Sequence, residues 1–77
     1  MTVEQFNDVL RAQPFRPFTI HMADGQKFHV QHRDFVSRSP TGRTVIVYGE
    51  NDRFDILDLL LMTQIEVHPP SQPGEAA

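Results

Sequence analysis

Hydrophobic residues recur along the first part of the chain at the spacings of three and four that are typical of an α-helix: Val3, Phe6, Val9 and Leu10. Thr2 and Gln5 match a capping box, in which each side chain accepts a hydrogen bond from a free backbone N–H. A helix of about twelve residues is marginal alone in water. We therefore predict a helix from Thr2 to about Gln13 that packs on another surface of the protein.

Two Pro-Phe pairs, Pro14-Phe15 and Pro17-Phe18, separate this helix from the residues that follow. Proline disfavours helical geometry in the preceding residue and donates no backbone hydrogen bond, so residues 14–17 are predicted to be extended. We expect Phe15 to close the seam beneath the helix and Phe18 to begin the core face of the first strand. The alternative, an exposed aromatic pair that recognises a partner, is disfavoured because apolar residues at such junctions usually belong to the core.

The pattern then alternates between hydrophobic and polar residues, which is typical of strands with one buried face. Residues 18–22 and 27–30 flank the tripeptide Ala-Asp-Gly. A two-residue turn would place Phe28 on the wrong face, whereas a three-residue loop places it opposite Ile20 in the core. We therefore predict the three-residue loop, with a positive φ at Gly25. The polar residues then share the outer face of this hairpin: His21, Lys27 and His29.

The following segments are also predicted to form a sheet. Residues 44–48, "TVIVY", are β-branched or aromatic throughout, which favours a strand with two apolar faces. We expect one face to line the core and the other to lie beneath the helix or a neighbouring subunit. Residues 54–57 and 65–67 alternate and predict a fourth and a fifth strand. Residues 58–62, "DLLLM", break the alternation and predict a tight helical turn between them.

These elements predict a mainly β fold with one N-terminal α-helix: a small five-stranded, strongly bent antiparallel sheet or barrel. A barrel is favoured because five strands in an open sheet would leave two unpaired edges. We assign residues 1–68 to a single helix-capped β-barrel domain. Residues 69–77 show no periodicity and are predicted to form a Pro-rich flexible tail.

The order of these elements resembles that of Sm-like and SH3-like barrels. The segments "FTIHMADGQKFHVQH" and "ILDLLLMTQIEV" look like the first and last parts of an Sm-like chain. The chain also resembles small bacterial proteins with a "PFxI…DG…VxH…LDLLL…IE" pattern, a likeness that implies no activity. Sm-like RNA binders carry an Asp- and Asn-containing loop and a basic signature, where this chain reads "HRDFVSRSP" and "LLLMTQ". The resemblance therefore implies a shape more than it implies RNA binding.

Composition limits the chemistry of this chain of 77 residues, which has a net charge of −3. Without cysteine, neither a disulfide framework nor a thiolate zinc site is possible. The first residues lack the pattern of a signal peptide, and the longest apolar run, Leu59–Met62, is too short to cross a bilayer. We expect a cytoplasmic protein with no membrane partner. Without a Gly-rich phosphate loop, a nucleophile elbow or an HExxH motif, we predict no enzyme and no cofactor.

Charge is unevenly distributed: residues 16–43 hold five Lys or Arg against two Asp, and residues 44–77 hold one Arg against six acids. A basic stripe can bind RNA by releasing the counterions condensed on the phosphates. The candidate residues for such a stripe are Lys27, His29, His32, Arg33, Arg38 and Arg43. The overall negative charge and the single tyrosine disfavour this reading, because single-strand binders also need aromatic platforms. An Sm-like RNA-binding ring is therefore the alternative hypothesis.

Four histidines raise the question of a metal site. His21 and His29 are predicted to be diagonal neighbours, with His32 and Asp34 further along the chain. A metal site needs three or four ligands, and this spacing supports two. We therefore predict no metal site.

Self-association is the property that the sequence supports best. The strand over residues 44–48 is apolar on both faces, and the leucine run adds a second apolar cluster that one short helix cannot fully cover. The predicted interface residues are Val45, Val47, Leu59, Leu60 and Leu61. We predict a non-enzymatic assembly or adaptor module that forms a homo-oligomer.

Overall fold

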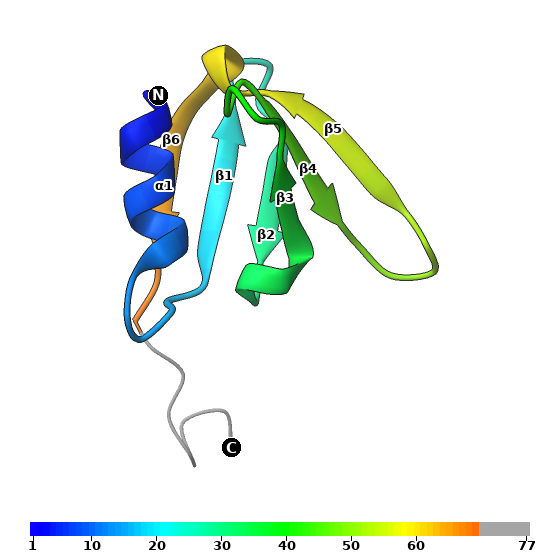
Figure 1. Cartoon of the computed structure of the whole chain (residues 1–77). Coiled ribbons are helices and arrows are strands. Elements are labelled where there is room, and N and C mark those ends of the chain that lie inside the picture. The colour runs from blue at the N-terminus through cyan, green and yellow to red at the C-terminus, as the bar shows by residue number, and fades with distance from the viewer. Residues whose placement is uncertain (70–77) are drawn as a thin grey trace.

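The computed structural model describes residues 1–69, which form one helix and two small antiparallel sheets (Figure 1). The sheets are three-stranded, with the strand orders β2-β1-β6 and β3-β4-β5. The elements are α1 (Val3–Arg11), β1 (Phe18–Met22), β2 (Lys27–Val30), β3 (Val36–Arg38), β4 (Thr44–Tyr48), β5 (Phe54–Asp58) and β6 (Met62–Val67). The prediction of a mainly β fold with one N-terminal helix is confirmed.

The prediction of one five-stranded sheet or a closed barrel is corrected, because the described residues form six strands in two separate sheets. The chain passes from one sheet to the other at two single-turn 3₁₀ helices, η1 (Arg33–Phe35) and η2 (Leu59–Leu61). The first of these turns separates β2 from β3, which makes the sixth strand. The second confirms the helical turn expected in the leucine run.

Helix α1 begins at the predicted capping box. The Thr2 hydroxyl accepts a hydrogen bond from the Gln5 backbone N–H at 3.1 Å, and the Gln5 side chain accepts one from the Thr2 N–H at 3.0 Å. The helix ends at Arg11, two residues before the predicted position, and Ala12 is already extended. The helix therefore ends before Gln13, the residue whose backbone Pro14 restricts. Its end is fixed at the C-terminal carbonyls of α1.

The register of the first hairpin is as predicted. Strand β1 pairs with β2 so that Ile20 lies opposite Phe28 and Phe18 opposite Val30. The loop has three residues and ends at Gly25, whose φ is +91°. Strand β6 pairs with the other edge of β1, so that β1 is the central strand of its sheet.

The core lies between the two sheets and α1. It contains Phe6 and Leu10 from the helix and Phe18 and Ile20 from β1. The remaining five strands and the turn η2 also contribute to it: Val30, Val36, Val45, Val47, Leu57, Leu59 and Met62. The rings of Phe6 and Phe18 meet edge to face with their centroids 6.0 Å apart. Phe15, which is partly buried, lies 5.9 Å from Phe18. The two Pro-Phe pairs therefore anchor the junction between helix and sheet, as predicted.

The described residues pack around this one core cluster, which extends from α1 to β6. Of the predicted flexible tail, all but Pro69 lies outside the described residues. Within residues 1–69, no helix has both the length and the apolar character needed to cross a membrane.

Two neighbouring leucines test the burial pattern. Leu59 is 1% exposed and Leu60 is 60% exposed. Replacing a buried leucine by alanine removes its transfer free energy and leaves a cavity, so Leu59→Ala is expected to lower the free energy of unfolding by about 2–5 kcal/mol. Leu60→Ala should change it by less than about 0.5 kcal/mol. Urea unfolding of both variants at low protein concentration measures the difference, and equal losses would contradict the placement of η2.

Two glycines with positive φ test the contact between α1 and the loop before β4. Both Gly25 and Gly42 have left-handed backbone, with φ of +91° and +81°. A Cβ at Gly25 would meet nothing within 4 Å, whereas one at Gly42 would lie 2.7 Å from Cγ1 of Val3. Gly25→Ala should cost about 1 kcal/mol of stability from backbone strain alone, and Gly42→Ala about 1–3 kcal/mol more from overpacking.

A double-mutant cycle tests whether the additional loss of stability in Gly42→Ala comes from the contact with Val3. Val3→Ala removes the side chain that a Cβ at position 42 would strike. In the Val3→Ala background, the cost of Gly42→Ala should fall toward that of Gly25→Ala, with a coupling of about 1 kcal/mol or more. Thermal or urea unfolding provides the measurement, and strictly additive effects would show that the contact carries no energy.

Candidate functional site

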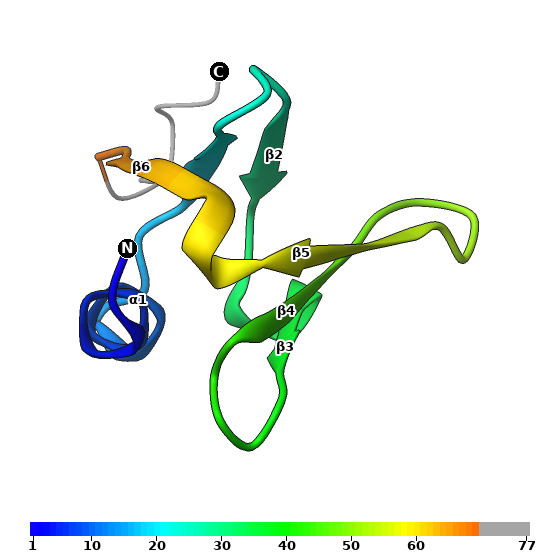
Figure 2. The same ribbon diagram turned by 90° about the horizontal axis from the view of Figure 1, so that it is seen from above.

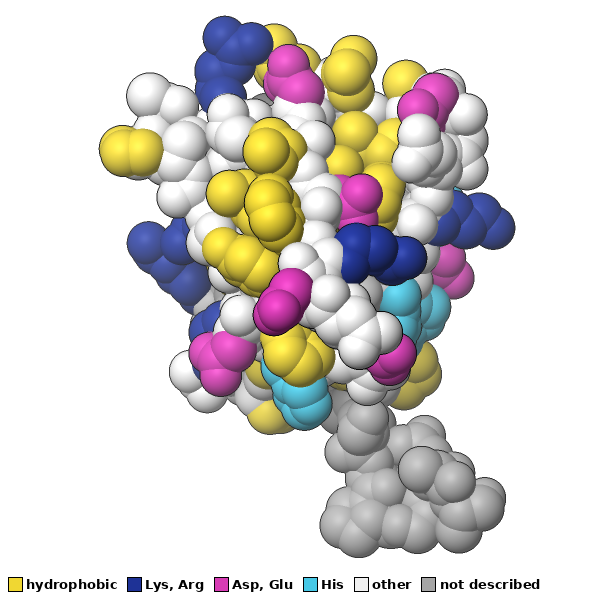
Figure 3. Space-filling model, turned by 90° about the vertical axis from the view of Figure 1, so that its right-hand side faces the viewer, with side chains coloured by type: hydrophobic (Ala, Val, Ile, Leu, Met, Phe, Trp, Pro, Cys, Tyr) yellow, Lys and Arg dark blue, Asp and Glu magenta, His cyan; other side chains and the backbone are white. Residues whose placement is uncertain are grey.

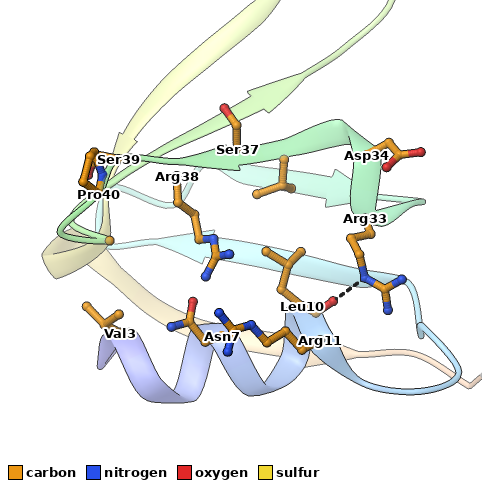
Figure 4. A pocket seen from close by; sticks show the side chains of 12 residues that line it. Val3, Asn7, Leu10, Arg11, Arg33, Asp34, Ser37, Arg38, Ser39 and Pro40 are labelled. Atoms are coloured by element: carbon orange, nitrogen blue, oxygen red, sulfur yellow. Dashed lines mark hydrogen bonds between the residues drawn. The ribbon is translucent and has the colours of Figure 1, made fainter.

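The residues of the predicted nucleic-acid stripe lie on different surfaces. Lys27 and His29 are exposed on the outer face of β2. Arg38 extends from β3 toward α1 (Figure 4). Arg43 is exposed in the loop before β4, where its carbonyl accepts a hydrogen bond from the Leu59 N–H. The six residues therefore do not form one continuous stripe, and RNA binding stays a prediction.

Arg33, another residue of that predicted stripe, is hydrogen-bonded to the C-terminal end of the helix. Its Nε donates a hydrogen bond to the carbonyl oxygen of Leu10 and its Nη2 donates one to that of Ala12, both at 2.8 Å. The guanidinium carbon also lies 5.4 Å from the centre of the Phe15 ring. Arg33 thus caps the C-terminal carbonyls of α1, a role that suits a cation at the negative end of the helix dipole.

A cleft lies between α1 and β3, where Arg33 closes one end (Figure 4). Asn7 and Arg11 line it from the helix, and Arg38 and Ser39 line it from the strand and the loop that follows. The Arg38 side chain points across the cleft toward Asn7 and Arg11, whereas the Asp34 side chain points away from it. The cleft is therefore lined by three guanidinium groups and by one carboxylate, that of Asp34, whose side chain points away from Asn7 and Arg38.

The five predicted interface residues divide into two groups. Val45, Val47 and Leu59 are buried in the core of the chain. They offer no surface to a partner, so this part of the prediction is corrected. Leu60 and Leu61 are more than half exposed in η2.

A different set of residues forms an apolar surface on the β3-β4-β5 sheet. Ile46 and Tyr48 of β4 alternate with the buried valines and lie directly opposite Ile56 and Phe54 of β5. Tyr48, Phe54 and Ile56 are 42%, 55% and 64% exposed. We call these four residues the outer apolar face. Figure 3, which views the side where the β4–β5 hairpin projects, shows a column of hydrophobic side chains.

The outer apolar face is not covered by α1. The helix lies beside β1 and β6, and the β4–β5 hairpin projects away from it (Figures 1 and 2). The sequence predicts that either the helix or a second subunit covers this face of β4. Within residues 1–69 the helix is ruled out as its cover.

Strand β5 is also an unpaired edge. Among the described residues it pairs with β4 alone. An exposed edge presents unpaired backbone N–H and C=O groups to any strand that approaches it. The predicted interface residues do not include those of β5, although the alternation of Phe54 and Ile56 with Asp55 and Leu57 gives this strand a second apolar face.

Three of the four histidines, His21, His29 and His68, lie on the outer face of the other sheet, whereas His32 precedes η1 and packs against Phe35. Thr19 Oγ1 lies 3.2 Å from Nδ1 of His29 and 2.8 Å from Nε2 of His68, and the two rings are 5.5 Å apart. His21 Nε2 instead donates a hydrogen bond to Glu66 Oε1 at 3.0 Å. In the part of the chain that the structure describes, no three His, Asp or Glu side chains are grouped to hold a metal ion.

The hydrogen bond from His21 lowers the pKa of Glu66 below its ordinary value. Burial opposes this effect, and the nearby charges of His68, His21 and Lys27 each add a smaller lowering. Because the folded pKa is the lower one, the stabilisation from this pair is present above the unfolded pKa. It is lost as the pH falls through the folded pKa.

Removing the donor tests this assignment. In His21→Ala, the pKa of Glu66 should rise toward that of an ordinary glutamate, because the largest cause of its depression is gone. Lys27→Ala, which removes only the smallest of the named causes, should raise it less. An NMR titration of the Glu66 carboxyl carbon measures both variants, and a larger rise in Lys27→Ala would overturn the assignment.

The cleft and the outer apolar face are two surfaces of different chemical character. They adjoin at Ser37, which lines the cleft and whose hydroxyl oxygen lies 3.2 Å from that of Tyr48. Comparison with protein families, curated proteins and solved structures found no match to this chain.

Proposed function

We propose that this protein is a non-enzymatic assembly module that associates with a second copy of itself through the outer apolar face. The observation that carries the proposal is the exposure of Tyr48, Phe54 and Ile56 side by side on two paired strands. Clustered large apolar side chains on a small domain mark an interaction surface more often than scattered ones do. Aromatic residues are also enriched in the buried centres of interfaces.

The polar residues around this face favour a copy of itself as the partner. Along β4 and β5, the same side of the sheet carries one charged residue, Asp58. Its carboxylate accepts a hydrogen bond from the Leu60 N–H at 2.9 Å and is held at the start of η2. The Tyr48 hydroxyl is satisfied locally by Ser37 at 3.2 Å. Two such faces can therefore pack without burying an unpaired charge in the apolar centre.

Face-to-face packing uses the geometry that sheets already have. Two sheets stack about 10 Å apart when their apolar side chains interdigitate. A contact of one face with the same face of a second copy is closed by twofold symmetry. We therefore propose a dimer as the basic unit, with the unpaired edge of β5 as the place where further strands can add.

The resemblance to Sm-like barrels stays a prediction, and it concerns the order of elements alone. An N-terminal helix precedes β1, and the last strand, β6, returns to pair with β1. RNA binding by a ring of subunits gains no further support, because Arg33 is engaged by the helix and the other basic residues are dispersed.

A charge introduced into the face tests the proposal. Ile56→Asp places a carboxylate at an exposed position, so the fold of the monomer should be retained while the dimer is lost. Gln64→Asp adds the same charge to an exposed position of β6, in the other sheet, and should leave the dimer intact. Sedimentation equilibrium over a protein concentration series gives the mass, and circular dichroism checks the fold.

The outcomes separate clearly. Loss of association in Ile56→Asp but not in Gln64→Asp supports the outer apolar face as the interface. A wild-type protein that stays monomeric up to millimolar concentration refutes self-association, and a dimer that persists in Ile56→Asp places the interface elsewhere.

A further inference from the structure

The cleft between α1 and β3 has a feature that the proposed assembly does not use: positive charge without a partner. Arg33 is engaged by the helix carbonyls, but Arg11 and Arg38 make no ion pair and no hydrogen bond from their side chains to any described residue. Arg38 is half-buried and reaches across the cleft toward the helix that carries Arg11 (Figure 4). Two guanidinium groups held in one cleft repel each other unless an anion lies with them.

A second observation in the same cleft is independent of charge. The side-chain oxygen of Asn7 is buried and has no hydrogen-bond donor among residues 1–69. A buried acceptor without a donor destabilises the folded protein, because it has lost its hydrogen bond to water and gained none in return. Such orphan groups in a folded protein call for an explanation, and one explanation is a ligand that supplies the missing partner.

From these two observations we infer that the cleft binds the phosphate group of a small molecule. A phosphate monoester carries up to two negative charges on three oxygens, which two guanidinium groups can contact together through charge-assisted hydrogen bonds. The alcohol part of such a molecule, when it keeps a free hydroxyl, supplies the donor that the Asn7 oxygen lacks. Ser39 also lines the cleft; its hydroxyl oxygen accepts a hydrogen bond from the Thr44 N–H and lies 3.3 Å from that of Thr41, and its proton can be donated to a phosphate oxygen instead.

The size of the cleft agrees with a small molecule. Its volume is about 820 Å³, within the range of roughly 300–1,000 Å³ that is usual for ligand pockets. Val3, Leu10 and Val36 add apolar atoms to its lining and can contact a short carbon chain.

NMR titration of the arginine side chains tests the inference. Inorganic phosphate and glycerol 3-phosphate are added separately at constant ionic strength, with chloride as the reference anion. Both should produce saturable shifts of the Nε–Hε signals of Arg11 and Arg38, and glycerol 3-phosphate should bind more tightly and also shift the Asn7 side-chain amide. Equal shifts with chloride would show that the anions act only through ionic strength, and the inference would fail.

Matched variants locate the site. Arg38→Gln should weaken binding of glycerol 3-phosphate by about ten- to a hundred-fold, the usual effect of losing a charge-assisted hydrogen bond. Arg53→Gln removes the same charge from the exposed turn after β4 and should leave the affinity unchanged. Equal losses in both variants would mean attraction by net charge alone and would overturn the site.

A third variant makes an independent prediction. Asn7→Asp keeps the shape of the side chain and places a carboxylate between Arg11 and Arg38, so it should lower the affinity for phosphate at least ten-fold and raise the melting temperature of the free protein. Unchanged affinity would refute the role of Asn7. If a single-stranded RNA shifts the arginine signals while both small probes fail, the ligand is a polynucleotide and the small-molecule assignment is wrong.

This inference is separate from the proposed self-association. The dimer-breaking variant Ile56→Asp lies in β5, outside the cleft, and should bind glycerol 3-phosphate as the wild type does. Loss of the dimer therefore leaves the cleft inference standing, and loss of phosphate binding leaves the dimer standing.

Discussion

The packing around Phe18 holds the parts of this protein together. In the sheet, Phe18 pairs with Val30 of β2 on one side and with Val67 of β6 on the other. In the core, its fully buried ring meets Phe6 of the helix edge to face and Phe15 of the connecting segment at a tilt. One side chain thus joins both neighbours of the central strand to the helix. A helix of nine residues cannot hold its conformation alone, so α1 depends on this contact for its stability.

Local signals in the sequence predicted the parts of the fold that short-range chemistry determines. The capping box at Thr2 and Gln5 placed the start of the helix correctly, because both hydrogen bonds form within one turn. The parity of Ile20 and Phe28 selected the three-residue loop, because a shift of one residue turns an entire strand over.

The errors came from interactions that are distant in the sequence. Strands β2 and β3 belong to different sheets because the chain turns at η1, where Arg33 is fixed by carbonyls more than twenty residues earlier, and no local pattern encodes that contact. The leucine run divides sharply between buried Leu59 and exposed Leu60, because a 3₁₀ turn directs successive side chains to different sides. The cleft could not be predicted from the sequence for a similar reason. Asn7 and Arg38 come to line the same cleft only after the sheet has folded against the helix.

The use of Arg33 as the C-terminal cap of α1 has a consequence for the order of folding. Its two hydrogen bonds close loops of 23 and 21 residues, which contain the whole first hairpin. The entropy of closing such a loop must be lost before the contact is gained. The hairpin of β1 and β2 can therefore form early from local contacts, while the end of the helix acquires its partner late. Along an unfolding trajectory, the same helix end is where the native structure comes apart first.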